Sequence, residues 1–184
     1  RSCPIAPRLS KAMLRAGSSR RLEMIALSAA TIDKGVAVAL LTPMTLAEAK
    51  LLGRRFGLAD ICEVTPIPHG SVNSNFRVAT ADGRRFFLRV CEESSLSEVA
   101  QQNRLLARLV AGGVATVAPL PLVDAPGSVA VHREKPAAAF AFRPGSWICQ
   151  QRVTSEHVRR VGEAVATIHL APVSASDIPV SRFG

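Results

Sequence analysis

The stretch that decides the fold is residues 66–90, PIPHGSVNSNFRVATADGRRFFLRV. It predicts, in order, the end of a strand, a polar turn led by a glycine at 70–75, a strand at 76–80, a tight turn and a strand at 85–91. Asp82-Gly83 indicates a hairpin, because both residues tolerate the positive φ of short hairpin turns. The last strand carries one cation, Arg89, among apolar neighbours. A turn of small polar residues beside such a cation is suited to holding a polyphosphate, since backbone N–H groups line the anion and the cation neutralises it.

Alternation along the last strand separates its two faces. Its even-numbered residues are all apolar, and its odd-numbered residues include Arg89. If the even set packs in the core, Arg89 is delivered to the opposite face, together with the polar turn. The residues alone leave a second interpretation open, in which Arg89 is a surface cation paired with Glu63 or Glu92. They also allow Asn73 and Asn75 to be simple turn formers.

Helices and further strands surround this hairpin. Thr45 and Glu48 have the spacing of a capping box and predict a helix that ends near Phe56, with Gly57 as its left-handed stop. The other expected elements are a strand at 61–68, a helix at 94–110 capped by Ser95 or Ser97, strands at 128–132 and 137–142 around Glu134-Lys135-Pro136, and a helix from Thr154 to about His169. The order strand, strand, strand, helix, strand, strand predicts an α+β fold, an antiparallel five-stranded sheet with one helix packed on it.

Composition restricts the class of function. The formal net charge is +9, but residues 1–43 hold seven basic and two acidic residues, which leaves a small excess for the folded part. That footprint, with one Trp and seven Phe, argues against a nucleic-acid partner. Four cysteines without a CxxC pair and four histidines without ligand spacing predict no metal site. The most apolar run, at 24–41, is interrupted by charge and too short to span a bilayer, so we expect no membrane partner and a cytoplasmic location.

Four parts are expected along the chain. Residues 1–43 are a basic extension, poorly structured or not part of the domain. Their composition also allows a transit-type presequence, the less favoured alternative. Residues 44–142 form the sheet-based domain, and 143–146, Arg-Pro-Gly-Ser, are the best candidate for a hinge. Residues 147–184 begin a helical part, whose apolar stripe has little in this chain to bury it.

Four segments in this order resemble the aminoglycoside phosphotransferase and choline kinase superfamily. They are GSVNSNF at 70–76, FFLRV at 86–90, NRLLARL at 103–109 and VGEAVATIH at 161–169. The first two are most similar to the homoserine kinase-like branch, and the resemblance covers about residues 45–184. It implies a protein-kinase-like fold with ATP between a small sheet-based lobe and a larger helical lobe. The implied ATP-binding residues are Gly70, Ser71, Asn73, Ser74, Asn75, Arg89, Ala141, Phe142 and Arg143.

Each group has an implied role. The turn would cover the phosphates, Arg89 would take the place of a lysine that contacts the α- and β-phosphates, and residues 141–143 would lie along the adenine. The glutamate that often orients this lysine in the family falls near Gln102, so the ion pair is absent or supplied by Glu98. The resemblance places the catalytic base and the Mg²⁺-binding Asp beyond Gly184. The chain is thus expected to be an N-terminal fragment with no catalytic and no metal-binding residue of its own.

Two classes of function follow. The first is an ATP-dependent kinase that phosphorylates a hydroxyl of an amino acid or amino alcohol, with homoserine as the leading substrate. This fragment alone would be inactive, because phosphoryl transfer needs carboxylates for the nucleophile and for Mg²⁺. The second is a non-catalytic module in which a kinase-like small lobe binds a nucleotide or a partner.

Overall fold

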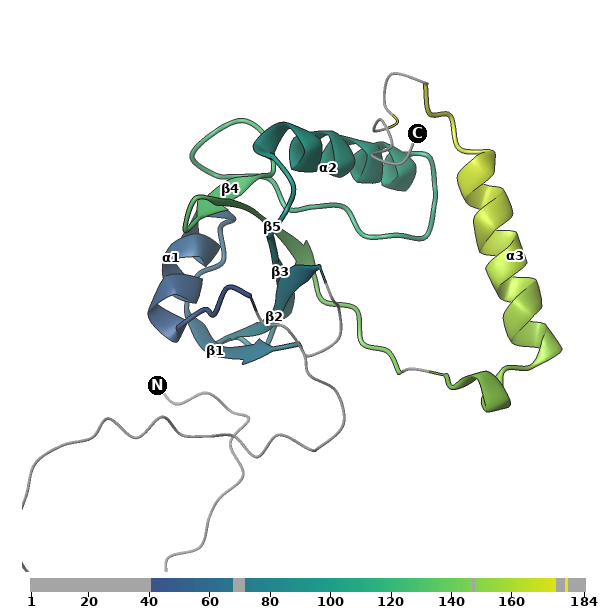
Figure 1. The fold of residues 1–184 in the computed structure, drawn as a ribbon, viewed down its shortest axis with the longest axis horizontal. Helices are drawn as coiled ribbons and strands as arrows, with labels where there is room; N and C mark the ends of the chain where they lie inside the picture. Colours follow the sequence, from purple (N-terminus) through teal and green to yellow (C-terminus); the bar gives the residue numbers. More distant parts are fainter. Residues whose placement is uncertain (1–40, 68–71, 147, 175–177, 179–184) are drawn as a thin grey trace, which may run out of the picture.

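The computed structural model describes residues 41–67, 72–146, 148–174 and 178 (Figure 1). Gly70, Ser71 and Trp147 lie outside the described residues, as does nearly all of the basic extension. The elements are α1 (Leu46–Arg55), β1 (Ile61–Pro66), β2 (Asn73–Thr80), β3 (Arg85–Cys91), α2 (Leu96–Ala111), β4 (Ala130–His132), β5 (Lys135–Ala141), a short 3-10 helix (Gln150–Arg152) and α3 (Ser155–His169).

The strands form one antiparallel sheet in the order β1-β2-β3-β5-β4. This confirms the predicted five-stranded α+β architecture. The hairpin between β2 and β3 closes where Asp82-Gly83 predicted it: Gly83 has φ +84° and the Thr80 N–H donates to the Arg84 carbonyl at 3.0 Å. Only the glycine of that pair takes up positive φ.

Two predicted boundaries are wrong. β2 begins at Asn73 and not at Phe76, because Asn73, Ser74 and Asn75 already pair with β3. The turn between β4 and β5 consists of Arg133 and Glu134, at φ 47° and 64°, and β5 starts directly after them. Two consecutive residues of positive φ make the tightest hairpin connection, which draws the next residue into the strand.

The hydrophobic core lies on one face of the sheet, and α1 covers it (Figure 1). Phe86, Leu88 and Val90 face this core as their alternation predicted, and the last two are fully buried. The element order predicts that the 94–110 helix packs on the sheet. In the structure, the helix that contributes to this core is α1, through Ala49 and Leu52. α2 buries only two of its own residues. It borders the cavity on the opposite face of the sheet through Leu106.

The three helices begin at the predicted caps. Thr45 with Glu48 and Ser95 with Glu98 form complete capping boxes, in which each side chain accepts a hydrogen bond from a backbone N–H of the other residue. Thr154 caps α3 in the same way, with His157 in place of the glutamate. Directly after the C-caps of α1 and α2 come Gly57 and Gly113, both of positive φ, which turn the chain out of each helix.

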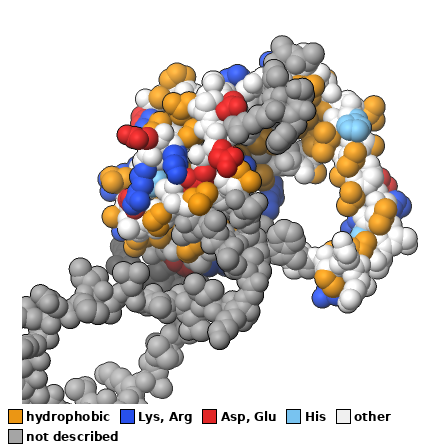
Figure 2. Space-filling model, in the orientation of Figure 1, with side chains coloured by type: hydrophobic (Ala, Val, Ile, Leu, Met, Phe, Trp, Pro, Cys, Tyr) orange, Lys and Arg blue, Asp and Glu red, His pale blue; other side chains and the backbone are white. Residues whose placement is uncertain are grey.

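The helix α3 stands apart from the sheet (Figure 1), and all its residues except His157 are exposed. Its apolar stripe includes Val158, Val161 and Val165, which are 62%, 63% and 45% exposed. Figure 2 shows the corresponding hydrophobic side chains along this arm of the molecule. An exposed stripe of this kind promotes association with other apolar surfaces.

We predict that the chain binds a hydrophobic dye and self-associates through α3. Replacing Val158, Val161 and Val165 by Gln keeps residues of good helix propensity and removes the stripe. Dye fluorescence and the weight-average mass in sedimentation should both fall. The single substitution Leu51→Gln, at an exposed leucine of α1, is the control and should change neither. An equal effect of both variants would contradict the assignment to α3.

Candidate nucleotide-binding site

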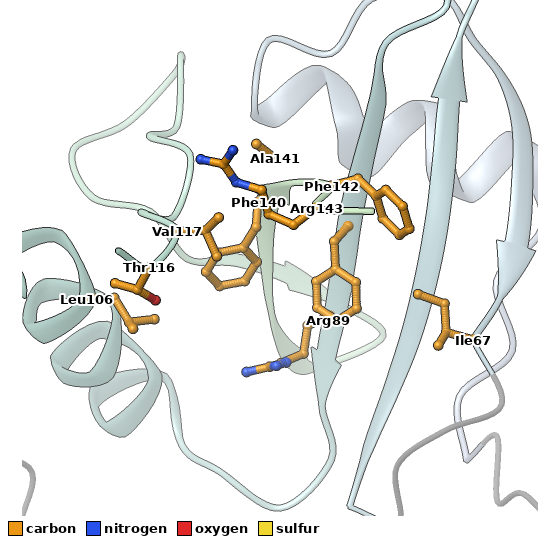
Figure 3. A pocket seen from close by; sticks show the side chains of 10 residues that line it. Ile67, Arg89, Leu106, Thr116, Val117, Phe140, Ala141, Phe142 and Arg143 are labelled. Atoms are coloured by element: carbon orange, nitrogen blue, oxygen red, sulfur yellow. The ribbon is translucent and has the colours of Figure 1, made fainter. Parts of the chain in front are cut away.

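A cavity of about 440 Å³ opens on the sheet face opposite the core (Figure 3). Its size is typical of small-molecule sites, which span roughly 300–1,000 Å³. The walls come from β3, β5, α2, the connector after α2 and the segment after β5. They are lined by Ile67, Phe87, Arg89, Leu106, Thr116, Val117, Phe140, Ala141, Phe142 and Arg143.

The central cation of this cavity is Arg89. Its guanidinium carbon lies 5.5 Å from the ring centre of Phe87 and 5.8 Å from that of Phe140. Figure 3 shows Arg89 pointing from the sheet towards the α2 side of the cavity, where Leu106 lies. Arg89 therefore lines the cavity and does not extend into bulk water.

Both carboxylates that could have paired with Arg89 at the surface are engaged elsewhere. Glu63 accepts a hydrogen bond from Arg77 at 3.2 Å, and Glu92 pairs with Lys135. Within the described part of the chain, no ion pair or hydrogen bond joins the Arg89 side chain to another residue. Its charge is thus available to an anionic ligand.

The helix α2 supplies no partner for this cation in the described structure. Gln102, which stands near the place of the family's orienting glutamate, is exposed. The Glu98 carboxylate accepts the Ser95 N–H at 2.6 Å and the Ser95 hydroxyl at 2.8 Å as part of the helix cap. Neither residue lines the cavity.

Asn75 lies beside Arg89, because the two are direct cross-strand partners of β2 and β3. The Asn75 Nδ2 donates to the Asn73 carbonyl at 3.2 Å, while its Oδ1 is buried without a hydrogen-bond partner. The Arg89 Nε is likewise buried without a partner. Buried polar atoms without a partner are uncommon in folded proteins, and a bound polar molecule or ion is one explanation for such a pair.

Asn73 and Ser74 have other contacts. Ser74 lies on the core face of β2, where its hydroxyl accepts the Thr42 N–H at 2.9 Å and donates to Glu92. The Asn73 Oδ1 accepts the Glu92 N–H at 3.3 Å. Both residues fix the start of β2 against the end of β3, and the structure does not bring them into the cavity.

Glu92 is the centre of this second cluster. Its side chain is 2% exposed and accepts hydrogen bonds from Lys135, Ser74 and Thr42. Burial alone would raise the pKa of Glu92, but these hydrogen bonds outweigh it and hold the pKa below its ordinary value. The Glu92 carboxylate is therefore ionised at pH 7. Its hydrogen bonds connect β2, the end of β3 and β5.

Residues 141–143 form one rim of the cavity. The Phe142 N–H donates to the Arg85 carbonyl at 3.2 Å, which continues the pairing of β5 with β3 past the end of the strand. Figure 3 shows the Arg143 and Arg89 side chains at opposite ends of the cavity, with Phe140 between them. Two arginines, and no carboxylate, are among the lining residues.

Several cavity residues could not be found from the sequence. Phe140, Thr116 and Val117 lie in no motif, and Leu106 lies in the 103–109 segment without an assigned role. Only the folded chain brings the connector after α2 against β5. The signal for Phe87 was present, since alternation puts it on the same face as Arg89. Alternation alone does not assign Phe87 to a ligand site, because an aromatic residue in a strand is usually a packing residue.

Comparisons with known proteins agree with this fold. Residues 63–183 match the model of the Phosphotransferase enzyme family. The chain belongs to this family of phosphate-transferring enzymes. Its curated relatives place it in the homoserine kinase-like branch: it is 31% identical over 119 residues to the homoserine kinase of Cupriavidus pinatubonensis and 29% identical over 147 residues to that of Janthinobacterium sp..

A solved structure has a similar fold. A spectinomycin phosphotransferase, solved in complex with ADP and spectinomycin, superimposes with a TM-score of 0.58 at 16% identity and covers 74% of this chain. This chain spans 41% of the length of that structure. The matches to the two homoserine kinases cover 63% and 79% of this chain, but only 35% and 43% of the relatives' own lengths.

Two further findings concern ligands and membranes. The described residues contain no group of three or more His, Cys, Asp or Glu that could hold a metal ion. None of the described residues that line the cavity carries a carboxylate, the side chain through which proteins usually hold Mg²⁺, so we assign none of them to Mg²⁺. No helix among the described residues has the length and apolar character needed to cross a membrane.

Proposed function

We propose that this chain forms the nucleotide-binding part of an ATP-dependent small-molecule kinase. The acceptor would be a hydroxyl group of an amino acid or amino alcohol, with homoserine as the leading candidate. The observation that carries the proposal is the guanidinium of Arg89, which no described carboxylate neutralises, inside a mostly apolar cavity. Such a cavity suits a ligand with a flat apolar base and an anionic tail. The family, and the ADP named in the spectinomycin phosphotransferase complex, support the same class of ligand.

In this proposal each part of the site has a separate role. Residues 141–143 border the adenine, and Arg89 contacts the α- and β-phosphates with Asn75 beside it. Gly70 and Ser71, which lie outside the described residues, belong to the turn over the phosphates. Residues 44–142 form the small lobe, 143–146 the hinge, and 147–184 the beginning of a helical lobe.

The catalytic base and the Mg²⁺ ligands are not assigned to this chain. The acidic residues after the proposed hinge that the structure describes are Glu156 and Glu163, and both form ion pairs with arginines on the exposed surface of α3. We therefore expect the 184-residue chain to bind nucleotides without transferring phosphate at a useful rate, since transfer needs a positioned nucleophile and Mg²⁺.

Calorimetric titration of the 184-residue chain tests nucleotide binding. We expect ADP and ATP to bind at one site and adenosine to bind more weakly by about tenfold or more, because a charge-assisted hydrogen bond contributes about 1.5–3 kcal/mol. Raising the salt concentration should weaken ADP binding and leave adenosine binding nearly unchanged. Absence of ADP binding at millimolar concentration would overturn the proposal.

The acceptor is tested in a chimera. Residues 44–184 would replace the matching part of the homoserine kinase of Cupriavidus pinatubonensis, and ADP release would be followed with L-homoserine, L-serine or choline. We expect turnover that depends on homoserine. A chimera that is folded and binds ADP but turns over none of the three would favour a nucleotide-binding module without catalysis.

A further inference from the structure

We propose that Phe87 and Phe140 are positioning residues that orient the Arg89 guanidinium for the phosphate tail of the nucleotide. This inference rests on the proposed function and assigns to two aromatic rings the task that a carboxylate performs when it orients a cation through an ion pair. Its basis is the geometry around Arg89, in which two rings lie within cation–π distance and no described carboxylate is paired with it.

The arrangement follows from strand alternation. Phe87 precedes Arg89 by two residues on β3 and therefore shares its face. On β5, Phe140 is the cross-strand partner of Phe87, and Ala138 is the partner of Arg89. Because Ala138 has only a methyl group, the long arginine side chain has space to lie across β5 beside Phe140. The two rings are 6.1 Å apart with an interplanar angle of 56°, so they border the guanidinium on two sides without stacking on each other.

This mode of orientation has two chemical consequences. A guanidinium held by rings keeps its full positive charge for the ligand, whereas one held by a carboxylate is partly neutralised. A planar guanidinium can also stack on the aromatic faces, which a compact ammonium cannot do. A lysine at this position would keep the charge, but its compact ammonium would lose the fixed fork that matches a phosphate.

The experiment compares ADP and adenosine affinities of the 184-residue chain in four variants. Phe87→Leu and Arg89→Lys should each weaken ADP binding about three- to tenfold, the cost of immobilising a freed side chain on binding, with little effect on adenosine. Phe87→Tyr, which keeps the aromatic face, should restore the ratio. Arg84→Lys is the matched control, since Arg84 stacks on Phe86 outside the cavity at 5.6 Å and is paired with Asp82; it should leave both affinities unchanged.

A measurement without ligand separates this inference from the proposed function. In a ¹⁵N-labelled chain, the Nε–H resonance of Arg89, assigned by its loss in Arg89→Lys, should be displaced by the two rings and protected from solvent exchange. Phe87→Leu should remove most of the displacement and Phe87→Tyr should keep it. If ADP does not bind, the proposed function fails. If ADP binds, but neither the affinity ratio nor the resonance responds to Phe87→Leu, the positioning role is wrong.

Discussion

Arg89→Ala is expected to weaken ADP binding by about 1.5–3 kcal/mol, the range for a hydrogen bond to a charged group. That loss corresponds to a roughly 10- to 150-fold higher Kd. The effect should be large because no other described side chain neutralises this guanidinium, so that all of its charge faces the ligand. Adenosine affinity should change little, since the alanine variant leaves the apolar walls and the rim at 141–143 in place.

Arg77→Ala is the control for this experiment. Arg77 pairs across the sheet with Phe87, carries the same charge and is joined to Glu63 at 3.2 Å, but it does not line the cavity. Its replacement should leave both the Kd for ADP and the salt dependence of that Kd unchanged. Equal ADP affinity of the wild-type and Arg89→Ala chains would return Arg89 to a purely structural role.

The second large effect is expected at Glu92. Glu92→Gln should lower the free energy of unfolding at pH 7 by about 2–3 kcal/mol, somewhat below the 3–5 kcal/mol typical of a broken buried ion pair. The reduction reflects Lys135, whose side chain is 36% exposed and can reach water when its partner is removed. The hydrogen bonds from Ser74 and Thr42 lose a charged acceptor at the same time.

The effect of Glu92→Gln should depend on pH in one direction. The pKa of Glu92 is lowered in the folded protein from a reference value of 4.5, so the folded state binds its proton less readily than the unfolded state. The stabilisation is therefore complete above about pH 4.5 and is lost as the pH falls through the folded-state pKa. Urea unfolding at pH 7 and near pH 3 should show the wild type and the variant converging at the lower pH.

Glu63→Gln provides the comparison on the same sheet. Glu63 and Arg77 are each 38% exposed, and an ion pair of that exposure contributes about 0–1 kcal/mol. The difference between the two glutamates separates the buried cluster from general loss of a negative charge. If Glu63→Gln destabilised the protein as much as Glu92→Gln, the cluster around Glu92 would have no special importance.

Local patterns in the sequence were sufficient for most of the fold. The capping boxes at Thr45 and Ser95, the Asp82-Gly83 hairpin and the alternation along β3 each depend on residues a few positions apart, and each is present in the structure. The start of β2 was misplaced because polar residues usually end a strand. Asn73–Asn75 instead continue it, since cross-strand pairing with β3 and the contact of Ser74 with buried Glu92 compensate for their low strand propensity.

The cavity was predictable only where it is continuous in sequence. The face of Arg89 follows from alternation along β3, and residues 141–143 were assigned only through the family resemblance. The aromatic pair depends on the register between β3 and β5, which no local pattern specifies. Ser74 and Asn75 point to opposite faces of the sheet. The sequence does not show this, because residues 70–75 have the composition of a turn and alternation applies only within a strand. The sequence suggests Glu92 as a surface partner of Arg89, but it belongs to a buried cluster. Its partners Lys135, Thr42 and Ser74 are distant in sequence, so no local pattern indicates the cluster.

The isolation of α3 has a consequence for its own persistence. A largely exposed helix of 15 residues is marginal in water, so its order depends mainly on the Thr154 cap and on the ion pairs that Glu156 and Glu163 make with arginines one turn away. The backbone amides of α3 should then exchange with deuterium much faster than those of the central strands β2 and β3. The same chain would present a slowly exchanging sheet and a rapidly exchanging helix, joined through the segment at 143–146.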